Sequence, residues 1–204
     1  MSFLSELDRS AILRLARMAA VDAVSGGKPP EQIPHEGIFA ERQGVFVTLR
    51  AGRRLRGCIG VIQPEEPLGD SIVRCAISAA LHDPRFPPTR LDELDELQIE
   101  ISLLSPMAPI KLQEIEIGRH GLLVCCGGRR GLLLPQVASE HHLSAHEFLE
   151  EACRKAELPR DAWLDPDTEV FGFTCEVFSD AIHLVDSQAP HRPKPAWPDS
   201  NLGK

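Results

Sequence analysis

A cysteine close to an arginine, in the segment Leu55-Arg56-Gly57-Cys58-Ile59-Gly60, is the feature of this sequence best suited to chemistry. The segment has the composition of a β-strand, on which side chains two residues apart point to the same face. Arg56 and Cys58 are therefore expected to lie together, roughly 7 Å apart at Cβ. A guanidinium beside a thiol favours the thiolate, which predicts a nucleophilic or redox cysteine. Gly57 and Gly60 indicate a bulge or the close approach of another chain or a ligand. The alternative is a cysteine that is only packed in a core.

The segment His82-Asp83-Pro84-Arg85 follows a helix expected at about residues 67–82. If the turn after that helix folds back over the thiol strand, His82 supplies a base for Cys58, and Arg85 holds an anionic group of a substrate. The structural alternative is that Arg85 pairs with Asp83 across a tight turn while His82 caps the helix C-terminus, where a cation is favourable. Both interpretations are open at this point.

Arg119 and His120 precede a later strand, and together they would complete an anion pocket, although a solvated start of a hairpin explains them equally well. His142 and His146 have the i, i+4 spacing of zinc ligands. His142, however, precedes Ser144, which is the expected cap of the next helix, so no metal site is predicted. No glycine-rich phosphate loop occurs, and nothing in the sequence names a cofactor.

Composition sets limits on partners and compartment. The 204 residues suit one domain, and 22 Lys+Arg against 30 Asp+Glu give a net charge of −8, which argues against nucleic acid as a partner. The six cysteines lack the paired spacing of zinc sites and are typical of reduced cytoplasmic thiols. No apolar run approaches the ~20 residues of a membrane span, so no membrane association is expected.

Hydrophobic periodicity predicts an α+β fold, a two-lobed single domain over residues 1–185 with an antiparallel sheet and packed helices. Two hairpins are expected, at 44–62 and 122–134, and each is followed by a helix. Their turns, Ala51-Gly52-Arg53-Arg54 and Gly127-Gly128-Arg129-Arg130, match, which suggests an internal duplication of β-hairpin–helix units. Residues 186–204 are Pro-rich and predict an extended or disordered tail, in which Trp197 is the one candidate anchor.

Strand alternation makes three further predictions about side-chain direction. Leu55 is expected on the core face of the thiol strand. Glu100 and Ser102 are expected to point outward together from a strand at about 97–103. Cys175 and Val177 are expected on the apolar face of the last strand, at about 169–178.

Four ordered stretches resemble the AMMECR-type family, whose signature is similar to LRGCIG at residues 55–60. The others are HDPRFPP at 82–88, GRHGL at 118–122 and GLLLPQVA at 131–138, and together they span most of residues 8 to 180. The resemblance implies a duplicated α+β fold with a cleft. Bacterial members are called AmmeMemoRadiSam system protein A, which implies an association with Memo-like and radical SAM proteins. It implies no particular reaction.

Two functions are therefore open. The first is a cytosolic small-molecule enzyme in which Cys58 is the cleft thiol, His82 assists it, and Arg56 and Arg85 bind an anionic group, with Arg119 and His120 as further contacts. The second is a non-catalytic accessory protein that binds Memo-like or radical SAM partners, or a metabolite, through the same cleft. The reactivity of Cys58 distinguishes them.

Overall fold

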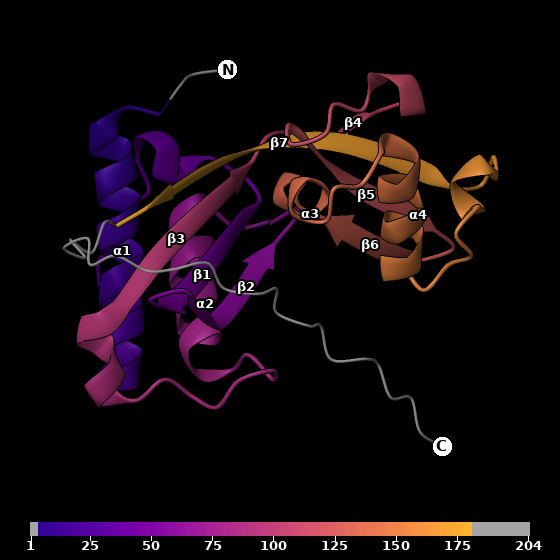
Figure 1. Ribbon diagram of the computed structural model, residues 1–204. Coiled ribbons are helices and arrows are strands. Elements are labelled where there is room, and N and C mark those ends of the chain that lie inside the picture. The colour runs from indigo at the N-terminus through magenta and orange to yellow at the C-terminus, as the bar shows by residue number, and fades with distance from the viewer. Residues whose placement is uncertain (1–3, 181–204) are drawn as a thin grey trace.

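The computed structural model describes residues 4–180, and Figure 1 shows how its elements are arranged. The helices are α1 (Glu6–Val24), α2 (Leu68–Leu81), α3 (Pro135–Glu140) and α4 (Ala145–Lys155), with short 3-10 helices η1 (Gly37–Ala40), η2 (Leu91–Glu96), η3 (Leu112–Glu114) and η4 (Ala162–Leu164). The strands are β1 (Val45–Ala51), β2 (Arg54–Val61), β3 (Leu97–Leu104), β4 (Ala108–Pro109), β5 (His120–Cys126), β6 (Arg129–Leu133) and β7 (Glu169–Ser179).

The strands form one curled antiparallel sheet in the order β2-β1-β3-β7-β5-β6, with β4 also paired to β7. The long strand β7 runs through both lobes (Figure 1), because its C-terminal half pairs with β3 and its N-terminal half pairs with β5. The first lobe holds α1, α2 and β1 to β3, and the second holds α3, α4 and β4 to β6. The predicted α+β fold with an antiparallel sheet is confirmed.

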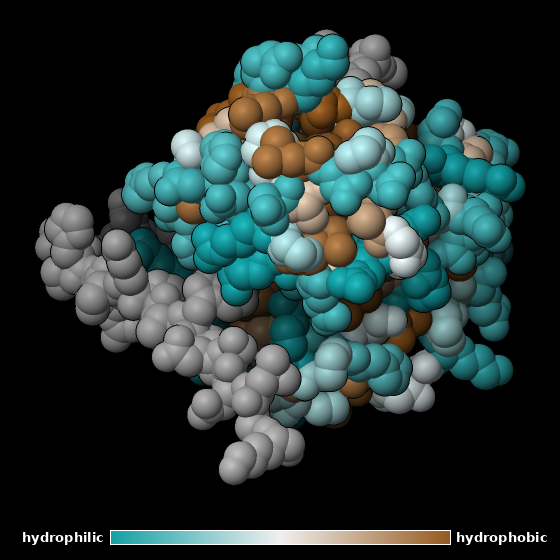
Figure 2. Space-filling view, turned by 90° about the vertical axis from the view of Figure 1, so that its right-hand side faces the viewer, coloured by the Kyte–Doolittle hydropathy of each residue, from teal (hydrophilic) through white to brown (hydrophobic). Residues whose placement is uncertain are grey.

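Each lobe has its own hydrophobic core on the helix side of the sheet. In the first, Ile72 of α2 and Val47 of β1 belong to one buried cluster. In the second, Phe148 of α4 packs with Val124 of β5. Figure 2 looks onto the end of the molecule formed by the second lobe, where apolar residues lie in separate patches among hydrophilic ones. Such scattered apolar residues are ordinary for a protein surface.

The expected cap at Ser144 is present and forms a capping box with Glu147 at the start of α4, and Ser5 caps α1 through Asp8 in the same way. Each lobe also repeats one order of elements: a hairpin, a helix and a third strand that pairs with the first strand of the hairpin. This likeness does not establish a common origin of the two units, and the internal duplication stays a prediction. Trp197 and the tail at 186–204 lie outside the described residues.

Three predictions of side-chain direction are wrong. The pairing of β1 with β2 shifts register between Leu49 and Arg50, so Arg50 lies opposite Leu55 and the alternation does not carry Leu55 into the first core. Ser102 points away from the first core, to which Ile101 and Leu103 belong, but it is buried at 2% exposure near Cys175 on the opposite sheet face. Val177 is 42% exposed at a part of β7 that β5 does not reach.

Candidate functional site

Cys58 lies on β2, the edge strand of the first lobe, directly opposite Thr48 of β1. The neighbours of Thr48 in sequence, Val47 and Leu49, point into the core, so Thr48 and Cys58 point to the sheet face opposite the helices. The Thr48 hydroxyl donates a hydrogen bond to the Cys58 sulfur at 3.3 Å. Thr48 is buried, whereas Cys58 is half-buried. The thiol is thus held by a buried donor and remains partly open on one side.

The backbone of Cys58 is fixed from the outer side of the edge strand by the turn that follows α2. Its N–H donates to Asp83 Oδ2 at 2.9 Å, and its carbonyl accepts from Arg85 Nη2 at 2.9 Å. Arg85 also donates to both oxygens of Asp83, through Nε at 2.9 Å and Nη2 at 2.7 Å. The Asp83–Arg85 ion pair therefore supplies the hydrogen bonds that a neighbouring strand would supply, and we call it the edge clamp.

The two charges of the edge clamp stabilise each other. The Asp83 side chain is 2% exposed, and burial alone would raise its pKa. The hydrogen bonds from Arg85, reinforced by the Cys58 N–H, outweigh that cost and lower the pKa of Asp83 to about 2. The same pairing raises the pKa of Arg85. The structural alternative, a turn-spanning pair of Arg85 with Asp83, is thus present, and the charge of Arg85 is committed to it.

Arg56 is ordered by hydrogen bonds within the fold. Its Nε and Nη2 donate to the two carboxylate oxygens of Glu93, at 2.8 and 2.9 Å, and its side chain is only 11% exposed. Arg56 lowers the pKa of Glu93 in return. Leu49 pairs with Gly57 and the next residue of β1 pairs with Leu55, which leaves Arg56 as the extra residue of a bulge. Alternation therefore does not place Arg56 on the face of Cys58.

Both glycines of the motif have close neighbours within the fold. A Cβ on Gly57 would lie 2.0 Å from the carbonyl oxygen of Ala79, where the end of α2 crosses β2. A Cβ on Gly60 would lie 2.3 Å from the ring of Phe46 on β1. The close approach and the bulge that these glycines predict are confirmed. The approaching groups are a helix backbone and an aromatic ring of the same chain.

His82 is the C-terminal cap residue of α2, and its N–H donates to the carbonyl of Ser78. Its side chain is exposed, and within residues 4–180 it makes no hydrogen bond to Cys58. This position agrees with the structural alternative for His82, a helix cap. A general-base role for His82 stays a prediction.

Arg119 and His120 lie in the second lobe, away from the edge clamp. Arg119 pairs with Glu116 at 2.9 Å, and His120 Nδ1 accepts a hydrogen bond from the Glu116 N–H at 3.0 Å. His120 alternates with the core residues Leu122 and Val124 on β5, which places it on the helix side of the sheet. The structure therefore brings Arg85 to Cys58, and it brings neither Arg119 nor His120 there.

Sequence reasoning missed Thr48 and Glu93. The register of the hairpin would assign Thr48 to Cys58 only if the bulge were known, because a regular pairing shifts every partner by one. Glu93 follows a proline-rich turn whose path has no periodic signal. Within the described chain, no cluster of His, Cys, Asp and Glu is arranged to hold a metal ion, and no helix is long and apolar enough to cross a membrane.

Comparison with known proteins gives the family. The AMMECR1 family model matches residues 13–178. A protein of Thermococcus gammatolerans is 46% identical over 198 residues, covering 90% of this chain and 94% of that protein. A protein of Methanothermobacter thermautotrophicus is 43% identical, covering 86% and 95%. The crystal structure of an uncharacterized protein of Pyrococcus horikoshii matches with a TM-score of 0.75 and 43% identity, over 83% of this chain and 90% of that one. The chain therefore belongs to the AMMECR1 family.

Proposed function

We propose that this chain is a binding protein whose ligand or partner contacts the sheet face that carries Cys58. The observation that carries the proposal is the state of the two motif arginines. Arg56 is held by Glu93 and Arg85 by Asp83, each through two nitrogen atoms. A guanidinium that already forms a bidentate pair with a carboxylate has little attraction left for an anionic substrate. These arginines therefore shape the edge of the sheet.

In this proposal Cys58 is a contact residue. Its backbone is fixed by the edge clamp on both its N–H and its carbonyl, which gives the thiol a defined position on the open face. A fixed, half-buried thiol next to Gly60 is suited to pack against a ligand. The family resemblance favours Memo-like and radical SAM proteins as partners in the cytoplasm, with a small metabolite as the other class of ligand.

A thiol enzyme is the second candidate, and one observation favours it. The Thr48 hydroxyl donates to the Cys58 sulfur at 3.3 Å, and a donor of this kind stabilises a thiolate more than a thiol. The enzyme would also require a cationic group that is available to the substrate. Arg85 would provide one only by releasing Asp83.

Alkylation of the native protein distinguishes the two candidates. Iodoacetamide is neutral and iodoacetate is an anion of similar size, so the ratio of their rates at Cys58 reports a cation near the thiol. The reference is the same ratio for N-acetylcysteine amide, a neutral free thiol, and Cys58→Ser identifies the labelled peptide. The binding protein is expected to show a ratio within about threefold of the reference.

A preference for iodoacetate of about tenfold or more, lost in Arg85→Gln, would support the anion-binding enzyme and contradict the proposal. A Cys58 that resists both reagents until the protein unfolds would contradict both candidates, because the thiol would then be only packed. Proteolysis and mass spectrometry of the labelled protein assign each rate to its cysteine.

A further inference from the structure

The C-terminal half of β7 has one open edge. Residues Cys175–Ser179 pair with β3 on one side. On the other side β5 begins at His120, opposite Thr174, so within residues 4–180 no strand continues along Cys175–Ser179. Open edges of this kind are usually covered or blocked, because their backbone groups accept another strand.

The hydrogen-bond pattern identifies the groups on this edge. The Ser105 N–H donates to the carbonyl of Thr174 at 2.9 Å, and the Asp180 N–H donates to the carbonyl of Ile99 at 3.0 Å. In an antiparallel pair, alternate residues direct both backbone groups to the same neighbour. The even-numbered residues therefore bond to β3, and Cys175, Val177 and Ser179 direct their N–H and carbonyl groups to the open edge.

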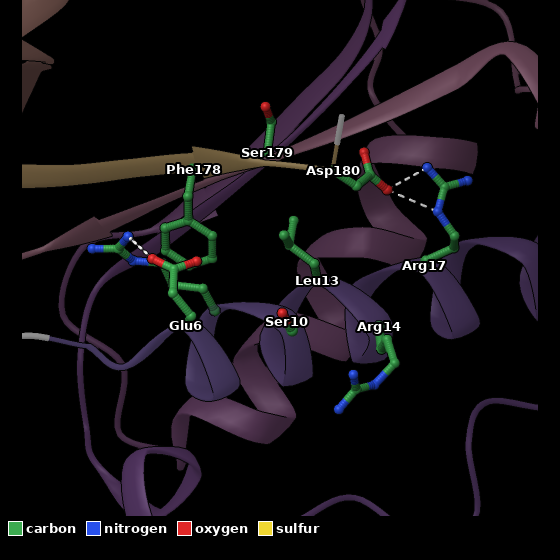
Figure 3. A pocket seen from close by; sticks show the side chains of 9 residues that line it. Glu6, Ser10, Leu13, Arg14, Arg17, Phe178, Ser179 and Asp180 are labelled. Atoms are coloured by element: carbon green, nitrogen blue, oxygen red, sulfur yellow. Dashed lines mark hydrogen bonds and ion pairs between the residues drawn. The ribbon is translucent and has the colours of Figure 1, made fainter. Parts of the chain in front are cut away.

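A groove lies beside this edge, between β7 and α1 (Figure 3), with a volume of about 450 Å³. Figure 3 shows the Phe178 ring extending from β7 toward α1 and Leu13 extending from α1 toward β7. Ion pairs close the two ends of the groove. Arg9 bonds Glu6 and Glu176 at one end, and Arg17 bonds Asp180 at the other. Between the two ends, the groove is lined by Leu13 and Phe178 together with the small polar residues Ser10 and Ser179.

Three arginines and three carboxylates lie at the groove. The charged lining is Glu6, Arg9, Arg14, Arg17 and Asp180, and Glu176 pairs with Arg9 at one end. Arg14 is exposed, and among residues 4–180 it forms no ion pair. A ligand that complements this lining carries an apolar side chain for Leu13 and a carboxylate for Arg14.

We propose that this edge and groove bind an extended peptide of a partner protein by strand addition. The backbone of the peptide would pair with Val177 and its two edge neighbours, and alternate side chains would enter the groove. The groove lies on the helix side of the sheet, whereas Cys58 points to the opposite face, so the proposal does not depend on the proposed function. Residues 181–204 suit it poorly, because their three Lys or Arg against two Asp repel Arg14 and their prolines lack the N–H that pairing needs.

The probe is the fluorescein-labelled peptide Thr-Val-Leu-Val-Glu-Val-Thr, whose valines face one side and whose leucine and glutamate face the other. Its binding to the full chain is measured by fluorescence anisotropy. Val177→Pro removes an N–H that points to the open edge and leaves the bonds to β3 intact, and Val177→Thr is its matched control. A peptide that is N-methylated at its valines lacks the backbone N–H groups that would bond to the open edge of β7, so it tests the same pairing from the side of the peptide.

We expect Val177→Pro to weaken binding about tenfold or more, Val177→Thr to change it by less than about threefold, and the N-methylated peptide not to bind. Arg14→Gln should weaken binding of this peptide and not of its glutamine counterpart. Equal binding of the methylated peptide, or no binding at about 1 mM probe, would overturn the proposal. So would a dimer in sedimentation that Val177→Pro dissociates, because the edge would then belong to a second copy. If Val177→Pro does not fold, the methylated peptide still decides.

Discussion

The carboxylate of Asp83 accepts a hydrogen bond from the backbone N–H of Cys58 at 2.9 Å, across the outer side of the edge strand β2. Arg85 bonds the carbonyl of the same cysteine and the same carboxylate. Two of the stretches that carry the family resemblance, at 55–60 and 82–88, therefore meet at the edge clamp. The edge clamp occupies the backbone groups of Cys58 at the sheet edge and fixes the position of its thiol.

Asp83→Asn should lower the free energy of unfolding by about 2 kcal/mol at pH 7, because Asn keeps an acceptor for Cys58 and loses the ion pair with Arg85. The folded state lowers the pKa of Asp83 from 3.8 to about 2. A carboxyl group with a depressed pKa adds stability above its unfolded pKa and loses it as the pH falls through the folded value. The difference between wild type and variant should therefore shrink between about pH 4 and pH 2, as measured by urea unfolding. Asp92→Asn, at an exposed pair with Arg90, is the control and should change stability by less than about 0.5 kcal/mol.

Gly57→Ala and Gly131→Ala should be among the most destabilising small substitutions, each by about 3 kcal/mol. The new methyl on Gly57 would lie 2.0 Å from Ala79 O, and that on Gly131 would lie 2.3 Å from Ala156 N. Both neighbours are helix backbone, so relief requires α2 or α4 to shift as a whole. Gly52→Asn is the control, because its φ of +58° suits Asn and nothing lies within 4 Å of its Cβ position. Thermal unfolding of all three variants tests the order, and a Gly57→Ala variant as stable as Gly52→Asn would contradict it.

The sequence predicts the elements of this fold well because their signals are local. The cap at Ser144 and the helix expected at about 67–82 depend only on neighbours a few residues apart. The failures concern long-range facts. A one-residue bulge at Arg56 breaks the alternation on which its expected face depended, and the burial of Ser102 depends on side chains of β1 and β7 that share its sheet face and are distant in sequence. Similarly, Glu93 reaches Arg56 because of the path of a proline-rich turn, and Thr48 lies opposite Cys58 because of the register of the hairpin.

The contributions of Arg56 and Glu93 to the free energy of unfolding should be coupled, whereas the nearby Arg53 should contribute almost nothing to it. We expect a double-mutant cycle of Arg56→Gln and Glu93→Gln to give a coupling energy of about 1 to 2 kcal/mol, since the pair is bidentate and Arg56 is only 11% exposed. Arg53→Ala, at the exposed hairpin turn, should change stability by no more than about 0.5 kcal/mol. Urea unfolding of the four proteins of the cycle gives the coupling. A value near zero would mean that Arg56 is available to a ligand.

Thr48→Val should slow the alkylation of Cys58, because the variant loses the hydroxyl that donates a hydrogen bond to the sulfur at 3.3 Å. The substitution is nearly isosteric and removes only one weak hydrogen bond, so the variant should fold, with a stability change of less than about 1 kcal/mol. Burial raises the pKa values of Cys75 and Cys175 to about 11, so labelling near pH 8 followed by peptide mapping reports Cys58 with little competition from these two.

Ser102→Ala is the control for Thr48→Val, since the Ser102 hydroxyl interacts with Cys175 rather than with Cys58. It should leave the rate at Cys58 unchanged. If Thr48→Val also leaves the rate unchanged, the hydroxyl does not contribute to the reactivity of Cys58. The observation that favours a thiol enzyme is then lost, and the sheet face of Cys58 is left with binding as its role. A clearly slower reaction in Thr48→Val alone would instead mean that the Thr48 hydroxyl promotes the reactivity of Cys58, which a purely packed cysteine does not require.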